Sequence, residues 1–178
     1  MMNYNYAYYP KLVESLGFEK EVDFVSCYLP SQAFKVPERV ERVAERVLER
    51  GNLSVKKFRN KRELVEWAPR IGAAYNKAFV HNWEYYPFSP SDVQYAVDNI
   101  FLVADPRLIK VILHGEEIVG FLFAFPDVSS ALQRAKGHLL PFGLPDLLLE
   151  MKRTKTISGN GMGILPEFQG MGGNALLY

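Results

Sequence analysis

Two observations predict an α/β or α+β fold for most of this chain. Segments with apolar residues at every third or fourth position, typical of helices, alternate with short apolar segments typical of strands. Of the 178 residues, 48% are hydrophobic and 23% are charged, a composition that supports a packed core and does not indicate disorder. We therefore expect a sheet with helices packed against it.

The overall composition argues against several classes of protein. The 21 basic and 20 acidic residues leave a formal net charge of +1, which gives no electrostatic reason to expect nucleic acid or an anionic membrane as a partner. The single cysteine, Cys27, rules out an internal disulfide and is expected to be buried. The longest apolar run, Ile118 to Phe125, is far shorter than the roughly 20 residues of a membrane helix. Residues 1–9 do not resemble a signal peptide, so we expect a cytoplasmic protein.

The first third of the chain predicts two helices and a strand. A short helix is expected over residues 8–17, which have a proline in the first turn and a glycine at the end, followed by a strand over 18–29. The strongest helical pattern covers residues 37–51, where valines recur on one face and charges occupy the other. The valines of that face are Val36, Val40, Val43 and Val47.

The middle of the chain predicts a strand followed by two helices. Residues 53–58 have the apolar character of a strand, and residues 61–80 that of a helix with a kink or break before Pro69. An aromatic loop at 81–88 precedes a helix over 90–101 that begins with a Ser-x-x-Asp cap. This order places two helices before the main hairpin.

The last third predicts a hairpin, a connector and a further strand. The hairpin strands cover 108–113 and 117–125. The connector, 127–152, contains two short helices, and its apolar residues are too numerous to face water, so we expect it to cover the sheet or the mouth of a cleft. A central strand is expected over 154–165.

The most informative segment follows that strand. Residues 164–177 contain a strand end, a proline, a glycine-rich turn and the start of a helix. Glycines at 170, 172 and 173 permit backbone conformations closed to other residues and allow a ligand to approach the main-chain amides. A tight turn without a ligand is the simpler interpretation of such a segment in isolation, and the spacing matches neither a P-loop nor a Rossmann fingerprint.

The same segment resembles motif A of the GNAT superfamily of acyl-CoA-dependent N-acyltransferases. The matching residues are Ile164, the sequence Pro-Glu-Phe at 166–168, Gln169 and Gly172, whereas Asn174 stands where the family prefers Gly or Ala.

The hairpin at 111–121 is similar to the second and third strands of that family, and the two helices before it are similar to the family's opening helices. The resemblance covers residues 53–178. It implies a mixed, mostly antiparallel sheet flanked by helices, truncated after the fourth strand and the start of the following helix.

The resemblance also implies a reaction and a set of contacts. Acetyl-CoA or another acyl-CoA would be the co-substrate, and a small-molecule or peptide amine would attack the thioester directly. Pantetheine would pair with the main chain of the fourth strand, and the pyrophosphate would lie on the amides of the turn. These cofactor-binding positions are Met162, Gly163, Ile164, Gln169, Gly170, Met171, Gly172, Gly173 and Asn174. No catalytic side chain is assigned. The alternative is a GNAT-like module that has lost catalysis and serves in binding or structure.

The two ends of the chain suggest a piece of a larger protein. Residues 8–20 resemble the closing helix and strand of a GNAT domain, whereas the domain that starts near residue 53 lacks its last strands. We therefore expect the tail of one domain at 1–30, a linker helix at 31–52 and the front part of a second domain at 53–178, with tandem or dimeric packing of such domains possible. Circular permutation, with residues 1–30 completing the same sheet, is the rival interpretation.

Several other side chains are candidates for a site. His81, Glu84, Tyr85 and Tyr86 lie in the loop that commonly contacts the acceptor in the family, although a packed aromatic loop explains them equally well. Asp127 follows a predicted strand and is expected to serve the local turn, not to act as a base. The three histidines are scattered without a glutamate at helical spacing, so no metal site is expected.

Overall fold

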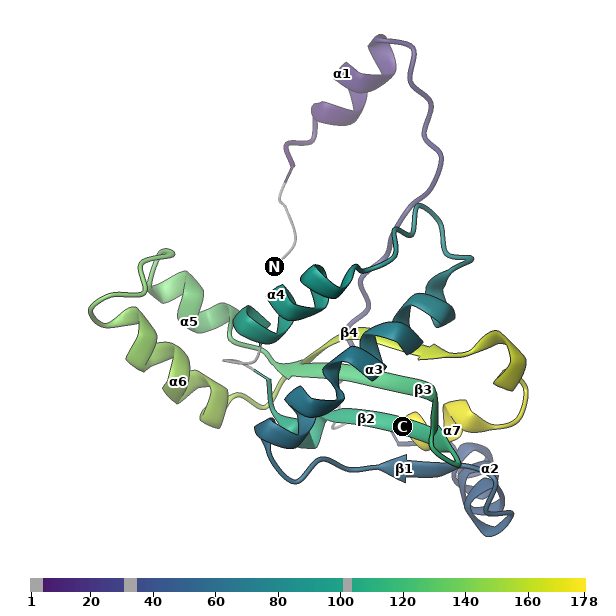
Figure 1. Cartoon of the computed structure of the whole chain (residues 1–178). Helices are drawn as coiled ribbons and strands as arrows, with labels where there is room; N and C mark the ends of the chain where they lie inside the picture. Colours follow the sequence, from purple (N-terminus) through teal and green to yellow (C-terminus); the bar gives the residue numbers. More distant parts are fainter. Residues whose placement is uncertain (1–4, 31–34, 101–103) are drawn as a thin grey trace. The chain divides into compact units, whose positions relative to one another are not determined.

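The computed structural model of the chain describes residues 5–30, 35–100 and 104–178 (Figure 1). The chain divides into two compact units, Met1–Lys35 and Val36–Tyr178. Residues 31–34, at the start of the predicted linker helix, lie outside the described residues.

The first unit contains one helix and no strand among its described residues. Helix α1, Tyr9–Ser15, confirms the predicted helix, with Pro10 in its first turn. The strand predicted over 18–29 is wrong: this segment is irregular, and every described residue of it is exposed. Cys27 is exposed as well, contrary to the expectation of burial. An extended segment becomes a strand only when its N–H and C=O groups find a neighbouring strand, and none lies beside this one among the described residues.

The second unit has a mixed α/β fold built on a four-stranded antiparallel sheet flanked by helices (Figure 1), which confirms the predicted fold class. The strand order follows the chain, from β1 through β2 and β3 to β4. The strands are β1, Ser54–Lys56; β2, Ile109–His114; β3, Glu117–Pro126; and β4, Ile157–Ile164. Within this unit, the described residues before Ser54 contribute no strand to the sheet.

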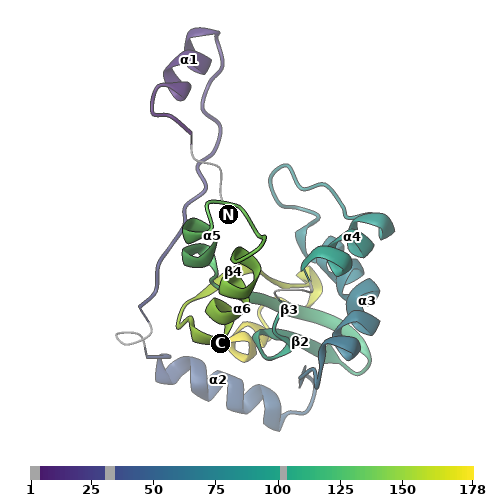
Figure 2. The ribbon, with the colours of Figure 1, turned by 90° about the vertical axis from the view of Figure 1, so that its left-hand side faces the viewer.

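The helices cover both faces of the sheet. Helix α3 packs on β3 and β4 and carries α4, whereas α2 packs against α7, which contacts β2, β3 and β4 (Figures 1 and 2). The helices are α2, Glu38–Glu49; α3, Lys61–Phe79; α4, Pro90–Ile100; α5, Ser129–Arg134; α6, Gly143–Arg153; and α7, Gly173–Leu177. Two 3₁₀ turns, Pro106–Leu108 and Pro166–Phe168, precede β2 and follow β4.

Alternating side chains of the strands form one core on each face of the sheet. On the side of α3, Val111 and Phe121 are completely buried. On the side of α2 and α7, Ile112 and Val119 are completely buried. Val111 and Ile112, neighbours in β2, thus enter opposite cores, as the period of two in a β-strand requires. Val119 and Phe121 of β3 do so although they are two residues apart, because the register of β2 with β3 shifts at Val119.

Helix α3 is continuous over its 19 residues, so of the kink or break predicted before Pro69 the break does not occur. A proline within a helix removes one hydrogen bond to the carbonyl four residues earlier. That carbonyl belongs to Val65, whose residue is exposed, so water offsets part of the loss. The helix begins at Asn60, whose side chain accepts a hydrogen bond of 2.9 Å from the Glu63 amide.

Glu63 ties the start of α3 to the first strand. Its carboxylate lies 2.5 Å from the ammonium of Lys56 in β1 and accepts a hydrogen bond of 2.8 Å from the Arg59 amide. These contacts, the Lys56 hydrogen bond first, lower the pKa of Glu63 to about 2, so the link is charged throughout the ordinary pH range.

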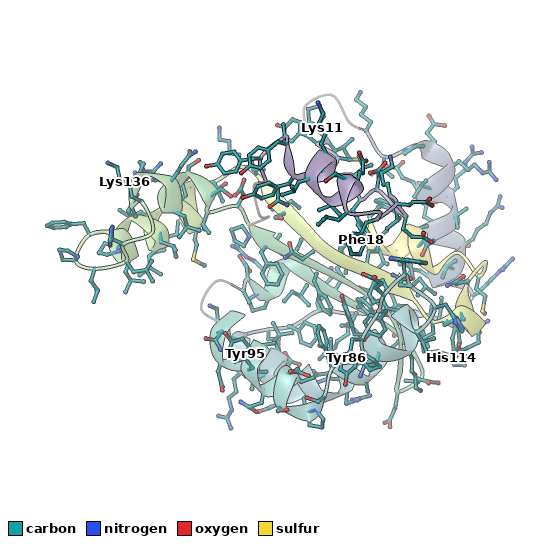
Figure 3. All side chains as sticks on the ribbon, turned by 90° about the horizontal axis from the view of Figure 1, so that it is seen from above. Lys11, Phe18, Tyr86, Tyr95, His114 and Lys136 are labelled. Atoms are coloured by element: carbon teal, nitrogen blue, oxygen red, sulfur yellow. The ribbon has the colours of Figure 1, made fainter. Side chains whose placement is uncertain are left out.

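The connector between β3 and β4 forms a helical hairpin. The Arg134 side chain of α5 donates to Asp146 at 2.9 Å and to Glu150 at 2.5 Å, both in α6. Leu147 is buried, but Leu140 and Phe142 near the turn are about four-fifths exposed, at 78% and 81%. The expectation that the whole connector covers the sheet or a cleft is therefore wrong for its tip, where Lys136 also lies (Figure 3).

Phe121 is the side chain whose loss should destabilise this unit most. It is fully buried in β3 and stacks on Tyr75 and Phe123 at centroid distances of 5.3 and 4.9 Å. We expect Phe121→Ala to lower the free energy of unfolding by about 3–5 kcal/mol, because a large cavity forms. Urea denaturation measures the change. Tyr95→Ala, at a position 70% exposed, is the control and should change it by less than about 0.5 kcal/mol. Equal losses in both variants would contradict the assignment of the core.

Candidate functional site

Strand β4 lies at the edge of the described sheet, which agrees with the expected truncation after the fourth strand but not with the central position predicted for residues 154–165. It pairs with β3 on one side, and no described strand pairs with its other side. Its register with β3 shifts at one point, where Phe123 pairs with Gly161 and Ala124 with Gly159. Asn160 is the extra residue of this β-bulge. A bulge on an edge strand leaves backbone groups without a partner in the ladder, and those groups are open to a ligand.

The glycines of β4 allow α3 to approach the strand closely. A Cβ atom on Gly163 would lie 2.9 Å from the Phe121 ring and 3.2 Å from Cβ of Ala78. A Cβ atom on Gly161 would already touch Phe123 and Tyr75, at 3.5 Å from each. A side chain at Gly163 would displace the Phe121 ring or push α3 away, whereas a Cβ atom on Gly161 would make only ordinary van der Waals contacts.

Aromatic rings fill the space between α3 and this strand. Tyr75 is the centre of the group, with centroid distances of 4.5 Å to Phe79, 5.1 Å to Phe88 and 6.1 Å to Tyr85. Burial raises the pKa of the Tyr75 and Tyr85 hydroxyl groups. Both phenols therefore stay protonated at neutral pH, and the Tyr85 hydroxyl donates a hydrogen bond to Oδ1 of Asn76.

Asn76 fastens the aromatic loop to α3. Its Oδ1 accepts hydrogen bonds from the Tyr85 hydroxyl and from the Phe88 amide, the latter at 2.9 Å. Its Nδ2 donates to the Phe88 carbonyl at 2.8 Å. One side chain thus places both ends of the segment 85–88.

The loop, α3 and β4 enclose an open cleft of about 760 Å³. Three of the four loop residues proposed from the sequence, Glu84, Tyr85 and Tyr86, line it, but His81 does not. Tyr86 lies on the side of the sheet that carries α3 and α4 (Figure 3). From the opposite wall, the cleft is lined by Leu122 of β3 and by Gly159, Asn160, Gly161 and Met162 of β4. The bulge therefore faces the aromatic loop across the cleft.

A second cavity, of about 320 Å³, lies deeper between α3, α4 and the sheet. Tyr75, Phe88 and Asn160 line both this cavity and the cleft, so the two spaces adjoin. The deeper cavity is otherwise lined by apolar residues of α3, α4, β2 and β3 and by Ala104.

The glycine-rich turn follows β4 after one turn of 3₁₀ helix. Gly170 and Gly172 have φ angles of +78° and +85°, a region that favours glycine. The Gln169 side chain donates to the Ile164 carbonyl at 3.2 Å and holds the turn against the strand end. Among the described residues, none accepts a hydrogen bond from the amides of Gly170, Met171 or Gly172, so these amides are available to a ligand.

The residues proposed along the strand differ in exposure. Met162 is 42% exposed and lines the cleft, Gly163 is half-buried, and Ile164 is only 7% exposed and belongs to the core. In the turn, Gly173 is buried and Asn174 is exposed. At Ile164 only the main chain can meet a ligand, whereas Met162 can offer its side chain as well.

Asp127 takes the local role expected for it. Its carboxylate accepts a hydrogen bond of 2.9 Å from the Ser129 amide at the start of α5, and bonding to Ser129 lowers its pKa. It does not line the cleft. Within the described ranges, His, Cys, Asp and Glu side chains do not gather in threes as a metal site would need. None of the helices in the described part of the chain has the length and apolar character of a membrane span.

Two residues of the site were missed in the sequence. Asn76 lies on a helix face between apolar neighbours, a pattern that could have marked it as a buried polar anchor. Asn160 stands between glycines in a strand, and such a Gly-x-Gly pattern is a signal for a bulge.

No protein-family model matches the chain. Protein YghO of Escherichia coli is 21% identical over 171 residues, which cover 95% of this chain and 43% of that protein. The bacterial ceramide synthase of Caulobacter vibrioides is 26% identical over 175 residues, covering 95% of this chain and 44% of that protein. The chain thus spans less than half the length of these two relatives.

Two solved structures show weaker similarity. An agmatine N-acetyltransferase superimposes with a TM-score of 0.37 and 15% identity, over 70% of this chain and 67% of that one. The polyamine N-acetyltransferase of Drosophila melanogaster gives a TM-score of 0.39 and 16% identity, over 70% and 66%. Values this low do not bear on what the chain does.

The Asn76 anchor generates a first prediction for the site. Because Asn76→Ala leaves the Phe88 amide and carbonyl unpaired, we expect about 1–3 kcal/mol less stability and faster hydrogen exchange at the Phe88 amide. Exchange measured by NMR checks this result. Asn99→Ala, which removes a hydrogen bond within exposed α4, is the matched control. Unchanged exchange at Phe88 in Asn76→Ala would contradict the anchoring role.

The turn generates a second prediction, from two glycines with similar φ angles. A Cβ atom on Gly172 would lie 2.8 Å from Val47 and 2.9 Å from Val43 of α2, whereas one on Gly170 meets nothing within 4 Å. Alanine at either position lowers the free energy of unfolding by about 1 kcal/mol because of its backbone conformation, and Gly172→Ala lowers it further because α2 must move. Urea unfolding should therefore show that Gly172→Ala is clearly less stable than Gly170→Ala. Equal stability would show that α2 does not pack on this turn.

Proposed function

We propose that this chain supplies the acyl-CoA-binding part of a GNAT-like N-acyltransferase, which moves an acetyl or longer acyl group from coenzyme A to an amine. The observation that carries the proposal is the bulged edge strand β4, which runs along an open cleft and leads directly into the glycine-rich turn. The amine in the cleft and the acyl group on coenzyme A would meet at this strand.

The unpaired edge of β4 suits the pantetheine arm. The amide groups of pantetheine can continue the sheet by hydrogen bonding to the main chain of β4 at Met162, Gly163 and Ile164. The pyrophosphate would then reach the turn, with the amides of Gly170, Met171, Gly172, Gly173 and Asn174 as candidate donors, whereas the proposed Gln169 amide already donates to the Pro166 carbonyl at 3.2 Å. The free amides in this turn support that assignment.

The chemistry needs positioning more than a reactive side chain. The neutral amine attacks the thioester carbonyl, a tetrahedral intermediate forms, and the C–S bond breaks to give the amide and the thiol, with the amine's proton passing to solvent or a base. A backbone amide near the Asn160 bulge is the candidate that stabilises the developing oxyanion. The aromatic loop held by Asn76 would exclude water and orient the amine.

The relatives support the type of reaction. A ceramide is an amide of a long-chain amino alcohol, so a protein named ceramide synthase joins an acyl group to an amine. That relative aligns with 95% of this chain at 26% identity. We extend to this chain only the formation of an amide, with a small-molecule or peptide amine as the acceptor.

The domain arrangement remains part of the proposal. Residues 53–178 would form the front of the acyltransferase domain, with 31–52 as the preceding helix and 1–30 as the tail of another domain. A strand from outside these residues would then cover the open edge of β4. Coenzyme A should accordingly bind more weakly to the 178-residue chain than to a longer protein that includes it.

The turn offers a direct test of the coenzyme site. Met171 is 45% exposed, and Met171→Glu places a negative charge where the pyrophosphate is expected. We expect at least about a tenfold rise in the KM for acyl-CoA, with kcat little changed, because like charges repel at short range. Thiol release from acetyl-CoA and from longer acyl-CoA, measured in the longest protein that carries this sequence, gives both constants.

Tyr95→Glu is the control, since Tyr95 is exposed on α4 away from the turn. Equal KM values for the two variants would contradict the proposed pyrophosphate site. Coenzyme A binding without any amine-dependent thiol release would favour a catalytically inactive module instead.

A further inference from the structure

The deep cavity beside the cleft has the properties of a binding site for an alkyl chain. Its volume is about 320 Å³, and its walls include Ala68 and Gly72 of α3, Val93 and Val97 of α4, and Phe123 and Phe125 of β3. A dry apolar cavity of about 150 Å³ holds benzene, with its six carbons, so this one has room for roughly twelve.

Small residues on α3 keep this space open. Ala68 and Gly72 lie one helical turn apart on the wall of the cavity. The two helices also approach closely at Gly72, since a Cβ atom there would lie 2.6 Å from Val93 of α4. A larger residue at position 68 would project into the cavity.

The cavity adjoins the polar cleft, and this continuity sets the character of the ligand. Tyr75, Phe88 and Asn160 line both spaces. A molecule that occupies both has an apolar tail on one side of these residues and a polar head on the other. The Asn160 bulge, where the proposed acyl transfer takes place, lies at the junction.

The charge of the cleft indicates which of the two reactants, the amine or the acyl-CoA, binds in these two spaces. Among the described residues that line either space, Glu84 is the one with an ionisable side chain other than tyrosine. Its φ angle of +50° is uncommon outside glycine, and this exposed residue lies in the cleft wall. A carboxylate attracts an ammonium head and repels a fatty acid or the phosphates of an acyl-CoA.

We propose that the acceptor is a single-chain amphipathic amine, whose alkyl tail of roughly twelve carbons fills the cavity while its amino group lies in the cleft with Glu84. The role of this amine as acceptor rests on the proposed N-acyltransferase function, but the binding of the amine itself requires no coenzyme. The arrangement would bring the nitrogen to the bulge of β4 and hold the tail out of water.

Calorimetry with a series of n-alkylamines from butylamine to tetradecylamine, kept below their aggregation concentrations, tests the tail site in the 178-residue chain. Each buried methylene should strengthen binding about fourfold, since it contributes about 0.8 kcal/mol. The gain should level off near dodecylamine, where the cavity is full. Affinity that does not rise with chain length would overturn the proposal.

Two alanines of α3 make a matched pair of variants. Ala68 lines the cavity, whereas Ala73 is exposed and lines neither space. Ala68→Phe should make the affinity level off several carbons earlier, and Ala73→Phe should reproduce the wild-type series. Ala68→Leu, which fills less volume, serves if the phenylalanine variant does not fold, and should give a smaller shift in the same direction. Identical series for the position-68 variants and Ala73→Phe would show that the tail lies elsewhere.

A comparison of head groups tests the role of Glu84. Wild-type protein should bind dodecylamine at least tenfold more tightly than dodecanoate or dodecanol, and Glu84→Gln should remove most of that preference without changing dodecanol binding. Tighter binding of dodecanoate would overturn the assignment to the amine and point to the acyl chain of the donor. Because no arm uses coenzyme A, failure of the Met171→Glu test would leave these affinities intact, so the two proposals fail separately.

Discussion

The contact between α3 and the glycines of β4 is the constraint on which the site depends. The Phe121 ring and Ala78 of α3 can lie against the strand because Gly163 has no side chain to hold them off, and Tyr75, which stacks on Phe121, reaches contact distance of Gly161. The same contact fixes where Tyr75 stands, and Tyr75 in turn borders both the open cleft and the apolar cavity. A strand of ordinary residues would pack at the usual spacing and leave a differently shaped space beside it.

The glycines that permit this packing also weaken the strand, because glycine loses more conformational freedom on folding than other residues. The cost falls on an edge strand whose outer side pairs with no described strand. Its inner side is nevertheless held by seven register pairs with β3, from Gly120–Ile164 to Pro126–Ile157. The result is a strand anchored on one side with an open backbone on the other, which is suited to accept an extended ligand or a further strand.

Elements that depend on residues close together in the sequence were predicted correctly. Features that depend on contacts between distant residues were not. The valine face of α2, the cap of α4 and the β2–β3 hairpin all follow from residues a few positions apart. The strand predicted over 18–29 has the right composition, but a strand also needs a neighbour, and the pattern does not supply one. In the site, the glycine-rich turn was visible, whereas the cavity depends on how Ala68 of α3 faces Phe125 of β3, 57 positions later in the printed sequence.

An apolar cavity next to a polar edge strand changes how binding energy can be used. Burying a tail in the cavity stabilises the complex without touching the reacting atoms, so by itself it lowers KM and not the barrier. It contributes to the rate only if filling the cavity also fixes the amine at the bulge. Tyr75, Phe88 and Asn160 connect the two spaces, and Asn76 holds Phe88 in place by its backbone. Those four residues are therefore where tail binding and head-group position are coupled, and chain length should affect kcat as well as KM if the coupling is strong.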